Sequence, residues 1–224
     1  MKKLISVIAG SFLAIMSFNV ASAVEMRLGV LGNMAADFGE AKETLKDSGQ
    51  ISKETAVLAH SYASVFAEVA LDQAAGLTFG VEYAPETIEL EKEARVIRES
   101  GTGDSGSQII DGEVEDLLTA YVALPIGETG AYVRLGYLQA TLNTQETLAT
   151  GSTYANVDIE GTQLGAGYMG EIGDNLFYKL EGVYNEWDNM ALNGSEEGGT
   201  SGSFNKIDAN ITGVAARLAV GFRF

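Results

Sequence analysis

Apolar and polar residues alternate along much of the chain, and they alternate most regularly in the terminal segment 212–224. Because successive side chains of an extended strand point to opposite faces, Arg217 and Arg223 fall on one face of this segment. The opposite face carries apolar side chains: Val214, Ala216, Leu218, Val220, Phe222 and Phe224. A strand that crosses a membrane needs roughly 9 to 11 residues, with one face toward lipid and the other toward a polar lumen. The terminal segment therefore predicts a membrane-spanning β-strand.

The same period of two recurs in other parts of the chain and predicts further half-apolar strands. The segments are 26–38, 62–71, 77–83, 115–124, 131–137, 163–168 and 177–184. With the terminal segment they make about eight strands, which is the smallest of the usual barrels with an even strand number. A soluble β-sandwich shows similar alternation, so the strands alone do not distinguish the two folds.

The connections between these segments separate the two folds. Three connections are short and rich in turn residues: 72–76, 125–130 and 170–175. Four are long and polar: 39–59, 85–114, 143–156 and 188–207. Long and short connections alternate strictly, as they do in outer-membrane barrels, where short turns lie at one end and long loops at the other. The sequence therefore predicts an all-β fold, a closed antiparallel up-and-down transmembrane β-barrel of about eight strands.

Aromatic residues on the outward face are expected to form two belts. One set maps toward the short turns: Phe79, Tyr168, Tyr178, Phe222 and Phe224. The other maps toward the long loops: Phe38, Tyr83, Tyr137 and Tyr184. Their separation agrees with a barrel that spans one membrane.

The beginning of the chain has the three parts of a secretory signal peptide. Lys2 and Lys3 precede an apolar run over 4–20, and small residues at 21–23 form a cleavage site. A membrane anchor is the alternative, but the apolar run is broken by polar residues and is short for a span of about 20 residues. We therefore expect residues 1–23 to be removed on export, and residues 24–224 to form the barrel domain.

The composition limits the possible partners. The formal net charge is −17, which argues against binding to the phosphates of nucleic acid. Acidic loops are expected to be a solvated coat or to recruit divalent cations or basic partners. The chain has no cysteine, which excludes disulfides and thiolate metal sites. No residue pattern indicates a cofactor, and none is expected.

The terminal residues Val220, Phe222 and Phe224 resemble the C-terminal signal of Gram-negative outer-membrane barrels, which the barrel-assembly machinery reads. By pattern, the whole segment 24–224 is similar to the small porin-family barrels, a group that includes the transmembrane domain of outer membrane protein A and adhesion barrels of similar size. The resemblance implies a location in the bacterial outer membrane and contact with its lipid and lipopolysaccharide. It also implies a role as a scaffold, a narrow pore or a surface adhesin with an extracellular partner at the loops.

Charged residues recur on the face that is expected to line the lumen. They are Arg27, Glu68, Glu82, Glu115, Arg134, Lys179, Glu181, Arg217 and Arg223. The interior of an eight-stranded barrel is just wide enough for side chains to fill it. Opposite charges are therefore expected to pair across the lumen, because an unpaired buried charge is very costly. These pairs form either a closed structural core or a gate whose ion pairs change partners.

His60 is followed by Ser61, Ser64 and Glu68, which are the residue types of a hydrolytic triad. The group faintly resembles the lipid A deacylase family. However, neighbours on a strand face opposite ways, and Ser64 is about 13 Å from His60 along an extended strand. No catalytic residue is therefore predicted.

The sequence predicts a non-enzymatic integral outer-membrane barrel with four long acidic surface loops, acting as a membrane scaffold or a surface-interaction protein. The alternative is a narrow porin that passes small solutes or ions. A lipid-modifying barrel hydrolase is the third possibility.

Overall fold

The computed structural model describes residues 24–44, 51–71, 76–89, 93–97, 106–147, 155–193 and 206–224. The expected signal peptide, 1–23, lies outside these residues. Eight strands form the wall of a barrel: β1 (Val24–Thr44), β2 (Ile51–Leu71), β3 (Leu77–Tyr83), β6 (Gly106–Pro125), β7 (Ala131–Thr147), β8 (Val157–Ile172), β9 (Leu176–Trp187) and β11 (Lys206–Arg223). Three short strands are added to it: β4 (Ile88–Glu89), β5 (Glu93–Ile97) and β10 (Met190–Asn193).

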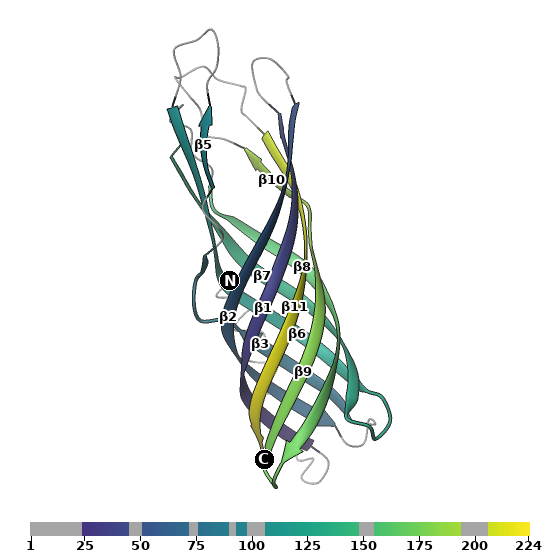
Figure 1. Cartoon of the computed structure of the whole chain (residues 1–224). Helices are drawn as coiled ribbons and strands as arrows, with labels where there is room; N and C mark the ends of the chain where they lie inside the picture. The colour runs from purple at the N-terminus through teal and green to yellow at the C-terminus, as the bar shows by residue number, and fades with distance from the viewer. Residues whose placement is uncertain are drawn as a thin grey trace.

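The eight strands close into a barrel by antiparallel pairing of neighbours (Figure 1). The order is β1-β2-β3-β6-β7-β8-β9-β11, and β11 pairs with β1 to close the sheet. Because β11 pairs with β1, neither of these two terminal strands leaves a free sheet edge. The predicted all-β, closed, up-and-down barrel of about eight strands is confirmed.

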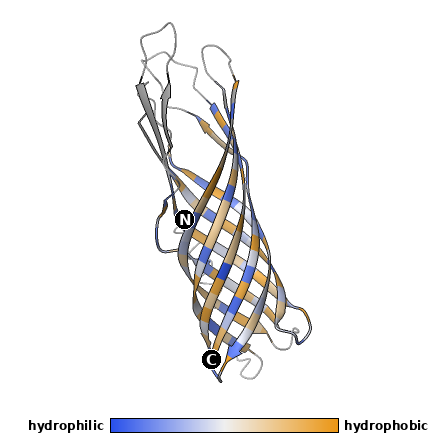
Figure 2. Cartoon of the chain, viewed as in Figure 1, coloured by the Kyte–Doolittle hydropathy of each residue, from blue (hydrophilic) through white to orange (hydrophobic). Residues whose placement is uncertain are grey.

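The barrel carries its apolar side chains on the outside, and Figure 2 shows the resulting checkered pattern of hydropathy along the strands. In β9, Leu180 is 52 % exposed, whereas its neighbours Lys179 and Glu181 are 4 % and 7 % exposed. A water-soluble protein would bury the leucine and expose the two ions. The inverted arrangement is that of a wall with lipid outside and a polar interior. Among the described residues, no helix is long and apolar enough to cross a membrane.

The short connections gather at one end of the barrel, called here the turn end, where the chain also ends (Figure 1). Strand β7 follows β6 after the turn at 126–130, and β9 follows β8 after the turn at 173–175. Gly127, Gly130 and Gly173 in these turns have positive φ angles, which glycine adopts without steric cost. The predicted short turns are confirmed in these two connections, and residues 72–75 of the third lie outside the described residues. The opposite end is called the loop end.

The predicted long connections are partly wrong, because the strands extend into them. Strand β1 continues to Thr44 and β2 starts at Ile51, so most of the expected loop 39–59 is a paired hairpin. Strands β5, β6, β7, β10 and β11 likewise occupy parts of the other three. Beyond the membrane both faces of a strand meet water, so the alternation disappears while the backbone hydrogen bonds continue. Residues 45–50, 90–92, 98–105, 148–154 and 194–205 of these connections lie outside the described residues.

A β-bulge interrupts the alternation of β6 after Glu115, which pairs with Thr141 of β7. Within the bulge, Asp116 has a φ of 55°. The additional residue reverses the faces of the strand. Val114 packs against apolar side chains inside the barrel, so its neighbour Glu115 lies on the outward face. The prediction that Glu115 points into the lumen is therefore wrong.

Candidate functional site: an ion-pair cluster across the lumen

Six buried charged side chains from five strands meet in the middle of the barrel. The cluster consists of Glu68 on β2, Glu82 on β3, Arg134 on β7, Lys179 and Glu181 on β9, and Arg217 on β11. We call this set the lumen cluster. It holds equal numbers of acidic and basic groups, so its formal charge is balanced.

The two arginines share the two nearer carboxylates. Arg134 lies 3.4 Å from Glu82 and 3.2 Å from Glu181, measured between guanidinium nitrogen and carboxylate oxygen. Arg217 lies 3.4 Å from Glu181 and forms a close ion pair with Glu82. Each arginine thus bridges two carboxylates from different strands, which ties β3, β7, β9 and β11 together across the interior.

Lys179 and Glu68 form the second part of the lumen cluster, nearer the turn end. The ammonium group of Lys179 forms a close ion pair with Glu68. The Lys179 nitrogen also lies 5.1 Å from the ring centroid of Phe66 and 5.8 Å from that of Phe177. Such cation–π contacts compensate part of the hydration that a buried ammonium loses.

Hydroxyl groups add hydrogen bonds to the carboxylates of the lumen cluster. Tyr121 donates a hydrogen bond of 2.6 Å to Glu68, and Tyr132 donates one of 2.6 Å to Glu181. Ser64 donates to Glu82 at 2.9 Å. A buried ion pair needs such additional hydrogen bonds, and they are supplied to one oxygen of Glu68, whereas its Oε2 accepts none from the described residues. The lumen is consequently filled at this level by a connected network of charges and rings.

Two of the inward arginines lie outside the lumen cluster, near the turn end. Arg27 pairs with Glu25 and lies 3.7 Å from Glu68, so it flanks the cluster. Arg223 pairs with Glu171 and donates a hydrogen bond of 3.0 Å to the carbonyl of Asp174.

The residues of the expected C-terminal insertion signal lie on the outer wall of the barrel. Val220, Phe222 and Phe224 are exposed on the outward face of the terminal segment. The rings of Phe222 and Phe224 are 5.1 Å apart, measured between centroids. This placement leaves them available to lipid.

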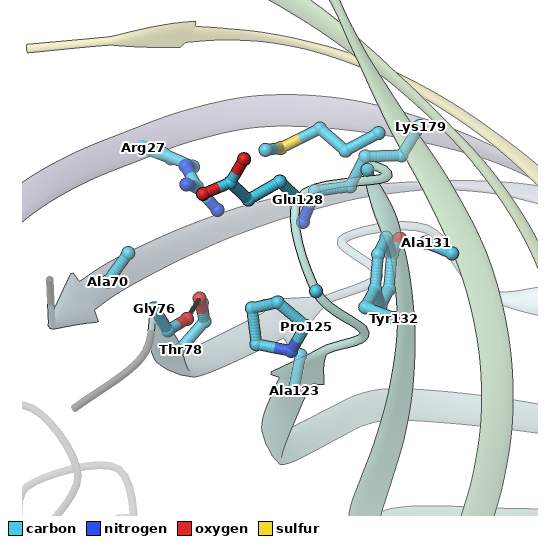
Figure 3. A pocket seen from close by; sticks show the side chains of 13 residues that line it. Arg27, Ala70, Gly76, Thr78, Ala123, Pro125, Glu128, Ala131, Tyr132 and Lys179 are labelled. Carbon is cyan, nitrogen blue, oxygen red and sulfur yellow. Dashed lines mark hydrogen bonds between the residues drawn. The ribbon is translucent and has the colours of Figure 1, made fainter.

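A cavity of about 220 Å³ opens between the lumen cluster and the turn end. Figure 3 shows the side chains that line it, among them Arg27, Glu128, Tyr132 and Lys179, with Glu128 pointing toward Arg27. Glu128 belongs to the turn between β6 and β7. Because Lys179 is a member of the lumen cluster, the cavity ends at the network of ion pairs.

His60 does not take part in a hydrolytic triad with the residues considered for it. Its Nε2 lies 3.6 Å from a carboxylate oxygen of Asp37, and its ring stacks on Tyr62 with centroids 5.9 Å apart. Ser61 is exposed on the outer face, and Ser64 donates to Glu82 instead. The Asp37–His60 pair was not predicted, because it depends on the register between β1 and β2.

No group of three or more His, Asp or Glu side chains in the described part of the chain is arranged to hold a metal ion. Sequence reasoning also missed the roles of Tyr121 and Tyr132. Both lie on the inward face by alternation, and an inward tyrosine opposite several carboxylates is the signal that identifies them.

Comparisons with known proteins show the fold of the chain but do not assign it to a family. No protein-family model matches the chain, and no curated protein matches it in sequence. The outer membrane protein OprG of Pseudomonas aeruginosa has a similar structure, with a TM-score of 0.54 and 12 % identity over 90 % of this chain and 96 % of that one. The outer membrane protease OmpT of Escherichia coli matches with a TM-score of 0.46 and 10 % identity, over 89 % and 97 % of the two chains. The Ail protein of Yersinia pestis matches with a TM-score of 0.37 and 12 % identity, over 87 % and 98 %. The similarity to OprG shows that the chain has the fold of an outer-membrane β-barrel.

Proposed function

We propose that this protein is an integral barrel of the bacterial outer membrane whose lumen is closed. It acts as a membrane scaffold that presents its loop end for interactions at the cell surface. In this proposal the turn end faces the periplasm and the loop end faces the outside. The protein carries out no catalysis. Its apolar outer wall contacts membrane lipid and lipopolysaccharide, and the barrel-assembly machinery recognises the terminal strand through Val220, Phe222 and Phe224.

The observation that carries this proposal is the lumen cluster. A hydrated ion that crosses the barrel must pass between Arg134, Arg217 and the carboxylates that bridge them. Separating a buried ion pair leaves charges that neither water nor a partner stabilises, and loss of one partner costs about 3 to 5 kcal/mol in buried pairs. Several such contacts must separate together for a continuous path. The resting barrel is therefore proposed to conduct poorly.

The loop end supports a role at the cell surface. Strands β1 and β2 stay paired out to Thr44 and Ile51, and apolar side chains such as Val57 are exposed there. A rigid paired hairpin holds its outer residues in a fixed position, whereas a free loop does not. Combined with the acidic composition, this surface suits a basic extracellular partner.

The narrow porin is the second candidate, and the cavity at the turn end favours it. This cavity of about 220 Å³ already occupies part of the path through the barrel. If Lys179 and Glu68 changed partners, the cavity would extend toward the loop end. A pore of this kind would open by rearrangement of ion pairs.

A liposome-swelling assay tests the proposal. The protein is reconstituted into liposomes, which are then diluted into isosmotic solutions of small neutral solutes. A closed scaffold gives the swelling rate of protein-free liposomes. Swelling that rises with the amount of folded protein and falls with solute size would support the porin instead.

A further inference from the structure

The wall of the barrel has a seam between β2 and β3 that is paired along only part of its length. The two strands pair from Leu71 and Leu77 at the turn end up to Val65 and Tyr83. Strand β2 continues to Ile51 and stays paired with β1 on its other side. Above Val65, the second edge of β2 has no strand partner among the described residues.

The sequence explains why the pairing stops. Pro85 follows the end of β3, and proline has no backbone N–H to continue a ladder of hydrogen bonds. After Pro85 the chain forms β4 and β5, which pair with β6 on the far side of the seam. Within the described part of the chain, the side chain of Glu86 bridges the opening, since its carboxylate accepts a hydrogen bond from the backbone N–H of Ala63.

An apolar compartment lies inside the barrel behind this seam. Buried apolar side chains pack together on the loop side of the lumen cluster: Ile88, Leu117, Leu138, Ile159, Trp187 and Met190. Tyr62 of β2 packs against them. The interior of an outer-membrane barrel is usually polar, so an apolar lining in the lumen requires an explanation of its own.

Polar groups face the apolar side chains across the same compartment. Asp37 and His60 form a pair on the β1–β2 side, with 3.6 Å between the carboxylate and Nε2. A cavity of about 30 Å³ separates this pair from Ile88, Leu138 and Trp187. That volume holds about one water molecule. A larger ligand therefore has to displace a side chain, and Ile88 stands on a strand of two residues.

We propose that this compartment binds a single-chain amphiphile that enters from the membrane through the seam between β2 and β4. The slender apolar tail takes the place of Ile88 beside Leu138 and Trp187. A hydroxyl or amine headgroup donates a hydrogen bond to Asp37. Glu86 closes the seam when the compartment is empty. This inference goes beyond the proposed function, because a closed scaffold needs no ligand inside its loop-side lumen.

The single tryptophan of the chain provides a direct probe, because Trp187 lines the compartment. The protein in lipid bilayers is titrated with a long-chain alcohol that carries bromine at the end of its tail, and quenching of Trp187 is followed. The proposal predicts saturable quenching at low ratios of alcohol to lipid. The matching bromoalkane, which lacks the headgroup, is expected to bind about tenfold or more weakly, corresponding to the loss of one hydrogen bond to a charged group.

Cross-linking tests the route of entry, and the absence of native cysteines makes it specific. A variant with Ala63→Cys and Glu86→Cys is bridged by a short thiol-reactive reagent and is expected to lose the saturable quenching. A control with Thr141→Cys and Asp158→Cys is bridged in the same way across the paired β7–β8 seam, and it is expected to keep the quenching.

Two outcomes would overturn the inference. The first is quenching that rises linearly with the alcohol content of the bilayer and never saturates, since partitioning into lipid alone produces it. The second is saturable quenching that survives the Ala63–Glu86 bridge in a folded variant. An Asp37→Ala variant checks the headgroup, because it must weaken binding of the bromoalcohol and leave the bromoalkane unaffected.

Discussion

The guanidinium carbon of Arg134 lies 3.7 Å from the centroid of the Tyr121 ring. The hydroxyl of the same tyrosine donates a hydrogen bond of 2.6 Å to Glu68. Tyr121 thus connects the arginine part of the lumen cluster with the Lys179–Glu68 pair. Gly80 leaves the space that the ring needs, because a Cβ at this position would lie 2.2 Å from the ring carbon Cζ. The packing of the lumen at this level therefore depends on one ring as well as on ion pairs.

The hydroxyl of Tyr121 should contribute measurably to stability. Tyr121→Phe removes the hydroxyl that donates to Glu68, so a buried carboxylate oxygen loses this hydrogen bond. We expect the free energy of unfolding to fall by about 1 to 3 kcal/mol. Urea unfolding of the protein in lipid vesicles measures the change. Tyr83→Phe is the matched control, since Tyr83 donates to Asp116 at an exposed site and should lose less than about 0.5 kcal/mol. Equal losses in the two variants would contradict the role assigned to Tyr121.

A side chain at position 80 should force Tyr121 out of place. Gly80→Ala places a methyl group in the space that the Tyr121 ring occupies, and overpacking of this kind costs about 1 to 3 kcal/mol of stability. Gly182→Ala is the control, because a Cβ at Gly182 has no atom within 4 Å. Heat-modifiability on gels and urea unfolding both report the difference. If Gly80→Ala folds with unchanged stability, the ring does not occupy the position described.

Arg134 and Glu181 should be strongly coupled. Arg134→Ala removes the positive charge that pairs with its carboxylate partners and should lower the free energy of unfolding by about 3 to 5 kcal/mol. Glu181→Ala should lower it by a similar amount. The double variant keeps the cluster balanced, so its loss should be clearly smaller than the sum of the two single losses. A double-mutant cycle in unfolding free energy gives the coupling directly. Strict additivity would show that the two groups do not interact.

Because of the bulge in β6, we expect substitutions of Glu115 and Glu82 to have different effects on stability. Glu115→Ala should change stability by less than about 0.5 kcal/mol, because Glu115 lies on the outward face. Glu82→Ala removes a carboxylate that pairs with Arg134 and Arg217, so it should destabilise the barrel by several kcal/mol, about the 3 to 5 kcal/mol of a broken buried pair. Unfolding in urea compares the two variants. Similar large losses would place Glu115 inside the lumen after all.

Much of the fold was predictable because the lipid selects one face of every strand. Leu180 between Lys179 and Glu181 shows this selection in three consecutive residues, and the same alternation gave the number of strands. The extended hairpin of β1 and β2 was missed since no such selection operates in water. The bulge at Glu115 was missed because one added residue leaves no trace in the composition of the strand.

The sequence did not predict which charged residues pair with one another in the lumen. Alternation placed Arg134 and Glu82 on inward faces, but it carried no information about their relative heights in the barrel. The register of each strand pair sets those heights, and β3 and β7 are not neighbours in the sheet. For the same reason, the pairing of Asp37 with His60 was not foreseen although both residues were inward by alternation.

Single-channel conductance in a planar bilayer tests the closed lumen most directly. The wild-type protein is compared with the Arg134→Ala, Glu181→Ala double variant and with a control, Glu171→Ala with Arg223→Ala, which removes a similar pair at the turn end. We predict a silent wild type, a silent control and steady openings in the lumen variant, because the two shortened side chains leave a gap in the network. Steady openings of the folded wild-type barrel, at a level that the lumen substitutions do not change, would contradict the account.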